Sequence, residues 1–174
     1  MDFNNVLESR KSIRKFQPTE ISEEIVREIL SLAQLAPSAG NLQAYKVKIV
    51  RTKDKRELLK EATFTRNFTK QESIMSAPVI FVICADPAES ETVFKERGKL
   101  LYALQDATIL AAYLQLVIAS KGLASVWIGS FNEDEVKKAL ALHNNLRPLI
   151  MIPFGFPGGE SRPRERKKLE EIII

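Results

Sequence analysis

Cysteine and histidine are almost absent from this sequence, with one of each in 174 residues. Cys84 alone forms neither an intramolecular disulfide nor an all-thiolate metal site, which favours a reducing compartment such as the cytoplasm. His143 alone excludes zinc sites that need two histidines, and a histidine-based triad would depend on this one residue beside a loop. We therefore expect no bound metal and no chemistry run by cysteine or histidine.

The sequence also lacks the glycine-rich patterns of the common nucleotide sites, since it contains neither G-x-G-x-x-G nor a P-loop. No uninterrupted apolar stretch approaches the roughly 18 residues that a membrane helix needs. The opening residues MDFNN have no basic segment followed by an apolar one, as a secretory signal would. We expect a soluble, cytoplasmic protein that does not act on a membrane.

The composition is typical of a folded chain, with 45% hydrophobic and 28% charged residues. A length of 174 residues is one domain's worth, using roughly 100–200 residues per domain. Since no repeat or Gly/Ser linker divides the chain, we expect a single domain over residues 1–174.

Helical and strand patterns alternate along the chain. Three- and four-residue apolar spacing predicts helices over residues 19–36 and 94–121, the second apolar on more than one face and ended by Gly122. Strand patterns cover residues 45–49, 77–85, 125–128 and 149–152, and Asn132 is placed to cap a short helix between the last two. Cys84 lies in the apolar run 77–85, so we expect it to be a core residue. The buried stripe expected along the long helix comprises Leu101, Leu104, Thr108, Ala111, Leu114 and Ile118.

Positive charge gathers at the two ends of the chain. Lysine and arginine number 26 against 22 aspartate and glutamate, a net charge of +4. The two clusters are Arg10, Lys11, Arg14 and Lys15 near the start, and Arg162, Arg164, Arg166, Lys167 and Lys168 near the end. We expect the two ends to meet whatever anion the protein binds.

Within the first cluster, Arg10, Ser12 and Arg14 alternate. In an extended stretch they project from one side as two guanidinium groups around a hydroxyl. Guanidinium forms paired, charge-assisted hydrogen bonds with oxyanions, which suits a phosphate monoester. A solvated basic turn is the alternative that this spacing alone leaves open.

Three further segments combine small residues with accessible backbone, namely APSAGNLQ at 36–43, WIGSF at 127–131 and PFGFPGG at 153–159. Gly129 in the second follows a strand and lets a backbone N–H approach a flat ligand. Taken in order, the segments of this chain resemble the nitroreductase family of FMN-dependent oxidoreductases in its compact form. The resemblance covers essentially the whole chain and rests on ESRKSIRKF, APSAGNLQ, APVIFVICAD, QDAT, GLASVWIG, LRPLIMIPFGFP and RPRERKKLEE.

The resemblance implies a fold and an assembly. The expected fold is α+β, with three layers in which helices flank a mixed central sheet. The expected assembly is a homodimer with shared flavin sites. The C-terminal arm of each chain, which ends in the isoleucines 172–174, would complete the sheet of the partner subunit.

The resemblance also implies which residues hold the FMN phosphate. Arg10, Lys11 and Ser12 match the N-terminal grip, and Arg164 and Arg166 match a C-terminal basic pair that closes on the same phosphate. The basic run 162–168 leaves the register of that pair open by one residue.

Around the flavin ring, the resemblance implies two catalytic positions. Arg14 matches a cation near the N1/O2 edge, and the backbone amide at Gly129 faces N5, with Ile128 and Ser130 beside it. The remaining implied contacts are Pro37, Ser38, Ala39 and Asn41 from the partner subunit and, on the pyrimidine edge, Gln71 with Lys70 and Ser73.

The activity implied is a ping-pong reaction. NADH or NADPH would pass hydride to N5 of tightly bound FMN, and a small-molecule acceptor, namely a nitro compound, a quinone or a flavin, would then be reduced. Arg14 would stabilise the negative charge that develops at N1/O2. Within the superfamily, the alternatives are a flavin-dependent dehydrogenase, a dehalogenase or a flavin-fragmenting enzyme.

Two alternatives have other functions. A flavin-binding protein without turnover would share every binding residue. A nucleic-acid-binding module would use the basic ends. We expect no nucleic-acid partner, because aromatic residues are not interleaved with the cations and glutamates interrupt the C-terminal cluster.

Overall fold

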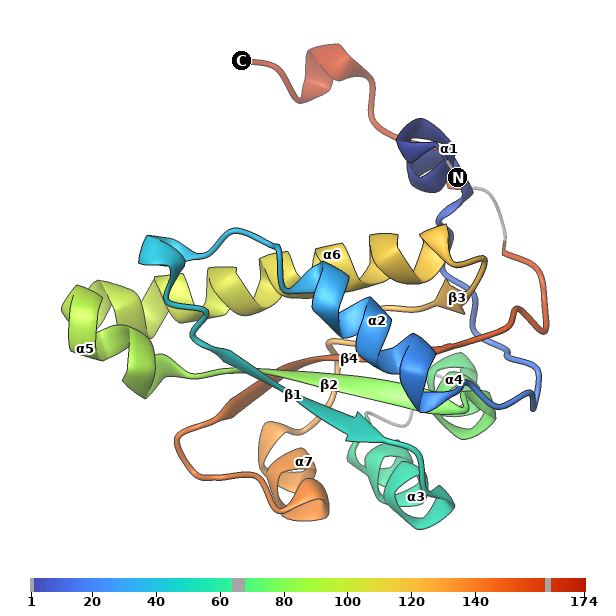
Figure 1. The fold of residues 1–174 in the computed structure, drawn as a ribbon, viewed down its shortest axis with the longest axis horizontal. Coiled ribbons are helices and arrows are strands. Elements are labelled where there is room, and N and C mark those ends of the chain that lie inside the picture. The colour runs from blue at the N-terminus through green and yellow to red at the C-terminus, as the bar shows by residue number, and fades with distance from the viewer. Residues whose placement is uncertain (1, 64–67, 162–163) are drawn as a thin grey trace.

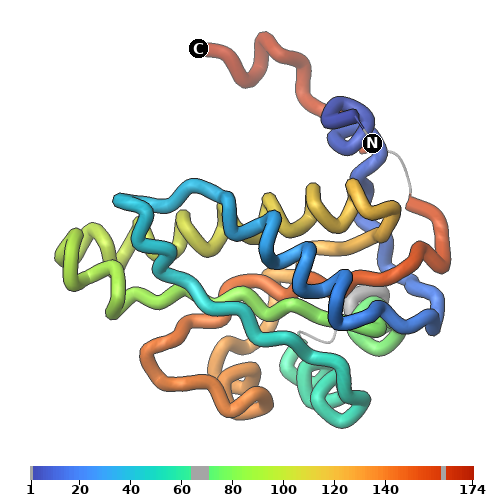
Figure 2. The backbone as a smooth tube through the Cα atoms, viewed as in Figure 1, coloured from blue at the N-terminus to red at the C-terminus, as the bar shows by residue number. Residues whose placement is uncertain are grey.

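The structure is a computed structural model and describes residues 2–63, 68–161 and 164–174. Arg162 of the C-terminal basic cluster lies outside these residues, and so does the side chain of Lys70. A four-stranded sheet lies between two layers of helices, as expected for three layers (Figures 1 and 2). The elements in chain order are α1 (Phe3–Ser9), α2 (Glu23–Ala33), η1 (Ala39–Asn41), β1 (Tyr45–Val50), α3 (Lys53–Ala62), α4 (Phe68–Ser76), β2 (Val79–Ala85), α5 (Pro87–Arg97), η2 (Gly98–Tyr102), α6 (Ala103–Ser120), β3 (Ala124–Ser125), α7 (Glu133–Leu140), β4 (Arg147–Gly155) and η3 (Leu169–Glu171).

The sheet has the strand order β1-β2-β4-β3, and each neighbouring pair of these strands is antiparallel. This differs from the mixed sheet that was expected. Among the described residues, the one parallel pairing is an isolated bridge between Ser12 and Ser125. The N-terminal segment therefore meets the sheet edge at a single point and does not add a parallel strand.

Strand β2 explains why residues 77–85 are apolar throughout. Its side chains alternate between two cores, with Phe81 and Ile83 in the layer beneath α2 and α6, and Ile80, Val82 and Cys84 in the layer that contains α3 and α7. A strand covered on both faces needs apolar residues at every position. Burial raises the pKa of the Cys84 thiol to about 11, so the expectation of a core cysteine is confirmed.

The long helix differs from the expectation at its start. Helical structure begins at Pro87, is interrupted by Lys95 at φ 56° and ψ −145°, and passes through the π-helical turn η2 before α6 begins. The π-turn adds a residue per turn, so Leu101, which lies in it, does not continue the regular spacing of α6. The buried line on α6 runs through Ala103, Ala107, Leu110, Ala111, Leu114 and Ile118, whereas Thr108, expected in the buried stripe, is exposed.

The residues that end α6 and begin α7 are those that the capping rules predict. Gly122 follows α6 in the left-handed region at φ 72°, and the Asn132 side chain accepts the N–H groups of Asp134 and Glu135. Helix α2 is shorter than residues 19–36 because Ser22 caps it through the N–H of Ile25. By length and composition the helical segment Pro87–Ser120 could cross a membrane, but its α6 portion packs across the sheet as a core helix does.

Candidate functional site

The two ends of the chain are brought together beside the last turn of α6. The N–H of Ile13 donates to the carbonyl oxygen of Ser125 at 3.1 Å, and the buried amide of Gln115 donates to the Ser125 hydroxyl at 3.3 Å. On its other side, the segment pairs with the chain that follows β4, because the Gln17 N–H donates to the carbonyl of Phe156 at 3.0 Å. Beyond this pairing, Ser161, Arg164 and Arg166 line one cavity together with residues of the N-terminal segment.

A glycine is needed for this close approach. A side chain at Gly158 would place its Cβ 2.8 Å from the carbonyl carbon of Phe16, closer than real contacts allow. The N–H of Gly158 donates to the carbonyl of Lys15 at 2.9 Å. The glycine-rich segment 153–159 thus joins the two basic clusters by packing backbone against backbone.

Between the two ends lies a cavity of about 390 Å³. This volume is in the range of small-molecule sites, roughly 300–1,000 Å³. Its lining brings together all five residues assigned to the phosphate, with Arg14 beside them. The lining residues are Leu7, Glu8, Arg10, Lys11, Ser12, Arg14, Ser161, Arg164 and Arg166.

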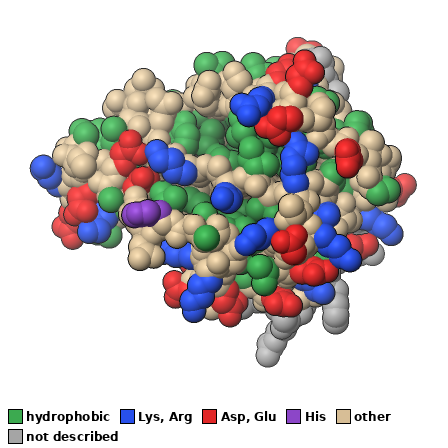
Figure 3. Space-filling view, turned by 60° about the horizontal axis from the view of Figure 1, so that its bottom comes forward, with side chains coloured by type: hydrophobic (Ala, Val, Ile, Leu, Met, Phe, Trp, Pro, Cys, Tyr) green, Lys and Arg blue, Asp and Glu red, His purple; other side chains and the backbone are tan. Residues whose placement is uncertain are grey.

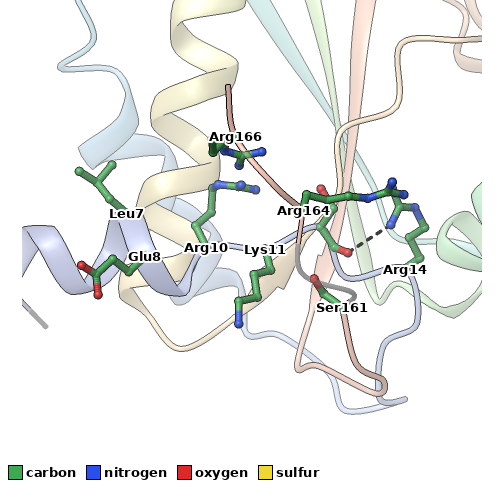
Figure 4. Close-up of a pocket in the computed structure, with 9 residues that line it drawn as sticks. Leu7, Glu8, Arg10, Lys11, Arg14, Ser161, Arg164 and Arg166 are labelled. Carbon is green, nitrogen blue, oxygen red and sulfur yellow. Dashed lines mark hydrogen bonds between the residues drawn. The ribbon is translucent and has the colours of Figure 1, made fainter. Parts of the chain in front are cut away.

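Positive charge dominates this cavity. Figure 4 shows the guanidinium groups of Arg14 and Arg164 turned toward one another, with Arg10 and Arg166 reaching in a common direction. Within the part of the chain that the structure describes, none of the five cations forms an ion pair. Five cations outnumber the one carboxylate of the lining, Glu8, and such an excess of positive charge favours binding of an anion.

The extended backbone predicted for residues 10–14 is consistent with this lining. Ile13 is buried, while Ser12 and Arg14 on either side of it face the cavity. Arg14 also donates from Nη1 to the carbonyl oxygen of Ser12 at 3.3 Å, the dashed line in Figure 4. Leu7, Glu8 and Ser161 are cavity residues that sequence reasoning did not single out, because a patch of lining is set by tertiary packing.

The segment expected to face the flavin ring lies outside this cavity lining. Ile128 is buried and exchanges two backbone hydrogen bonds of 2.9 Å with Met151 on β4. The next residue, Gly129, is exposed. A Cβ there would meet the Trp127 indole nitrogen at 3.5 Å and the Leu149 carbonyl oxygen at 3.9 Å, which are ordinary contacts. Packing within the chain does not require a glycine at this position.

Helix α4 lies next to the basic segment. Its Glu72 pairs with Lys15 at 3.8 Å, and its Ser76 hydroxyl accepts the Phe16 N–H at 3.3 Å. Gln71 is half-buried on this helix, whereas Ser73 is fully buried. Ser73 has no exposed surface in this structure, so the assignment of Ser73 to the flavin edge stays a prediction.

The loop with Pro37, Ser38, Ala39 and Asn41 lies at the opposite end of α6 from the basic cavity (Figure 1). The N–H of Ala39 donates to Asp106 near the start of α6, whereas Ala119 near its end lines a second pocket together with Arg10 and Lys11. Thirteen residues of helix separate these two points, about 20 Å at 1.5 Å per residue. Within one chain this loop and the cavity are separate.

Asp106 is the buried carboxylate of this region. Only 2% of it is exposed, and burial raises the pKa of Asp106 although the backbone amides of Ala39 and Ala44 favour its charged form. Its Oδ1 accepts the Ala39 N–H at 2.9 Å, while Oδ2 has no hydrogen-bond partner among the described residues. Burial, and to a lesser extent the charge of Asp106, raises the pKa of Tyr45, whose buried hydroxyl likewise lacks a partner among the described residues. Asp106 belongs to the QDAT motif, to which the sequence alone assigned no function.

The protein has a layered α+β fold with a basic cavity built from both ends of the chain. Comparisons with known proteins show which family has this fold. The model of the nitroreductase family matches residues 7–156. A nitroreductase family protein from Clostridium novyi NT is 32% identical, with a TM-score of 0.83 over 90% of this chain and 87% of its own. The chain belongs to the nitroreductase family.

Two other similarities extend over the full length of the chain. An NADH dehydrogenase from Thermus thermophilus is 26% identical over 100% of this chain and 96% of its own sequence. A protein from Exiguobacterium sibiricum, crystallised in complex with FMN, is 19% identical with a TM-score of 0.86 over 100% of this chain and 97% of its own. The second similarity supports the fold only.

Proposed function

We propose that this chain is an FMN-dependent oxidoreductase that takes reducing equivalents from NADH or NADPH and passes them to a small-molecule acceptor. The observation that carries the proposal is the cavity in which arginines from both ends of the chain meet, none of them in an ion pair among the described residues. Family membership and the NADH dehydrogenase relative support the reaction class.

The donor set of the cavity fits a flavin phosphate. A phosphate monoester carries a charge of about −1.5 to −2 at neutral pH and offers several acceptor oxygens. Arg10, Arg164 and Arg166 supply guanidinium donors, Lys11 a further cation and Ser12 a hydroxyl. These residues would hold the phosphate by charge-assisted hydrogen bonds, which are the stronger kind.

Bound FMN would supply hydride acceptance from the nicotinamide and electron delivery to the acceptor. The protein's own contribution is electrostatic and steric. Arg14 lines the same cavity as the phosphate residues and would stabilise negative charge at the N1/O2 edge. Gly129 would offer a backbone N–H beside an open face, consistent with a glycine that packing does not require. Ile128 and Ser130 would flank it, with Ile128 anchored on β4.

We further propose that the working unit is a homodimer. The loop with Pro37, Ser38, Ala39 and Asn41 can contribute to a flavin site only from a second chain, because about 20 Å of α6 separates it from its own basic cavity. Apolar side chains support such an interface, since Leu100 is 61% and Tyr113 39% exposed near and on α6. The C-terminal arm exposes Leu169 and the isoleucines 172–174, and it extends away from the sheet, as an arm that joins a partner's sheet would (Figure 1).

The first test is spectroscopic. The purified protein, or the apoprotein reconstituted with FMN, should show a flavin absorption spectrum that bleaches anaerobically when NADH or NADPH is added. Steady-state oxidation of either nicotinamide with quinones, nitroaromatics and free flavin as acceptors identifies the acceptor class. A colourless protein that does not take up FMN refutes the cofactor. A flavoprotein that never oxidises a nicotinamide refutes the reaction and favours a binding role without turnover.

The face of the molecule drawn in Figure 3 gives no support to nucleic-acid binding. On the face in Figure 3, lysine and arginine side chains are interspersed with aspartate and glutamate and form no continuous basic stripe. Nucleic-acid sites present clustered cations along one face. We propose that the cations at the chain ends serve one phosphate and not a polyanion.

A further inference from the structure

The loop of residues 38–43 has a backbone conformation that needs support from outside itself. Gly40, Asn41 and Gln43 all have positive φ, at 55°, 55° and 53°. L-residues other than glycine rarely adopt this region, and such conformations persist where surrounding contacts enforce them. Gly40, Asn41 and Gln43 are themselves exposed, so burial of these three residues provides little of that support.

Some support comes from within the loop. The Ser38 hydroxyl accepts the Gln43 N–H at 3.0 Å, and the carbonyl oxygens of Ser38 and Ala39 accept the N–H groups of Asn41 and Leu42, both at 3.0 Å. These bonds keep the turn closed. They do not fix its position on the rest of the protein.

Two groups outside the loop set its position. The Phe94 ring packs under Gly40, where a Cβ would lie 2.9 Å from Cζ of that ring. The buried carboxylate of Asp106 accepts the Ala39 N–H at 2.9 Å, and the amide of Ala44 favours the charged form of the same carboxylate from the other end of the loop. Asp106 therefore fixes the loop at Ala39, close to the point where the loop leaves the packed structure.

A buried carboxylate with one oxygen that lacks a partner among the described residues lowers the free energy of unfolding. Stability alone would favour an apolar residue on the face of α6 that packs against the sheet. Residues that break a local rule in this way are expected at functional positions. The Asp106 carboxylate serves a loop that is exposed, strained and assigned to the flavin.

We propose that Asp106 is a positioning residue that fixes the loop 38–43 of one chain in the conformation it presents to the flavin site of a second chain. The inference rests on the proposed function for its flavin, but the anchoring of the loop is independent of any cofactor. Asp106 itself touches neither flavin nor substrate.

Three variants separate this role from a general structural one. Asp106→Ala removes the acceptor. Asp106→Asn keeps a side-chain oxygen for the Ala39 N–H without the charge. Ala39→Pro removes the donor at the first residue of η1, and its neighbour Ser38 is already extended at φ −143° and ψ 159°, as a residue before proline prefers. The control is Val136→Ala, which empties part of the buried core at α7 in the opposite layer.

The first measurement is hydrogen exchange of peptides that cover residues 37–44 in the full-length protein, without added FMN. Exchange should accelerate at least about tenfold in Asp106→Ala and Ala39→Pro, but stay near wild type in Asp106→Asn and Val136→Ala. Unchanged exchange in both Asp106→Ala and Ala39→Pro overturns the inference. Should Asp106→Ala fail to fold, Ala39→Pro and Asp106→Asn still decide it.

The second measurement is FMN affinity at a temperature well below each variant's unfolding transition. Asp106→Ala and Ala39→Pro should raise the Kd at least about tenfold, Asp106→Asn less than about threefold, and Val136→Ala not measurably. If wild type binds FMN and the first two variants bind it equally well, the positioning role is refuted. If wild type itself does not bind FMN, the proposed function fails, and the exchange data still test whether Asp106 anchors the loop.

Discussion

Arg166→Ala provides the sharpest test of the two-ended phosphate site. Arg166 lines the cavity from the C-terminal segment, alongside Arg10 from the other end of the chain. We expect the substitution to weaken FMN binding but leave riboflavin binding unchanged, because riboflavin has the same ring system without the phosphate. Lys167→Ala is the matched control, since it removes the same charge at the next position, which does not line the cavity.

The size of the effect follows from the exposure of the side chain. Two unit charges 4 Å apart interact by about 1 kcal/mol in water and about 4 kcal/mol at an effective dielectric constant of 20. Arg166 is exposed, so the lower figure applies, about doubled for a phosphate near −2. Ordering the side chain offsets part of this gain. A net loss of about 1–2 kcal/mol corresponds to a Kd roughly 5–30 times higher.

The assay uses the only tryptophan of the chain. Trp127 lies two residues from Gly129 and is 37% exposed, so flavin bound there should quench its emission. Wild type and both variants are titrated with FMN and with riboflavin, at about 0.1 M and 1 M salt. The difference between the two ligands gives the contribution of the phosphate group to the binding free energy. The difference for Arg166→Ala should shrink at high salt, where the Debye length falls from about 10 to 3 Å. Equal losses for both ligands, or the same loss in Lys167→Ala, would refute the phosphate role.

Three further predictions concern the ring and the buried carboxylate. Arg14→Ala should lower the flavin midpoint potential by about 20–40 mV, equivalent to about 1–2 kcal/mol for two electrons, and a spectroelectrochemical titration that finds no shift contradicts its role at N1/O2. Gly129→Ala should leave the unfolding midpoint in denaturant unchanged, since its Cβ meets only ordinary contacts, but weaken FMN binding. Because burial raises the pKa of Asp106 from 3.8, the folded chain binds more protons than the unfolded chain at that residue. The free energy of unfolding should therefore fall as pH rises from about 4 through the raised pKa, and chemical denaturation of Asp106→Asn should lack that slope.

Much of the architecture could be predicted because local rules and tertiary packing agree. The apolar run 77–85 predicts a strand covered on both faces, and β2 is that strand. Asn132 caps α7 and Gly122 ends α6 as expected. Where the side that packs against the sheet decides burial, prediction failed, as at Thr108, which was expected in the buried stripe of α6 but is exposed.

Some residues of the candidate site could be predicted from the sequence, and others could not. Residue type and alternation at Arg10, Ser12 and Arg14 predict an anion site, because guanidinium and hydroxyl groups at period two project to one side of an extended chain. Ser73 shows the limit of such reasoning, since a polar residue at an expected position turned out to be buried. Asp106 shows the reverse, because its importance comes from a contact with Ala39, 67 positions away along the chain.

The sequence by itself determined the alternation of helices and strands, the two basic clusters and the family resemblance, because these depend on side-chain chemistry and spacing along the chain. Only the tertiary structure decided that the clusters share one cavity, since this required the segment after β4 to pack against residues 15–17 through Gly158. It also decided that the 38–43 loop lies at the far end of α6 from that cavity and is held by Asp106. Contacts between residues distant in sequence depend on how the layers pack, and local pattern carries no information about that packing.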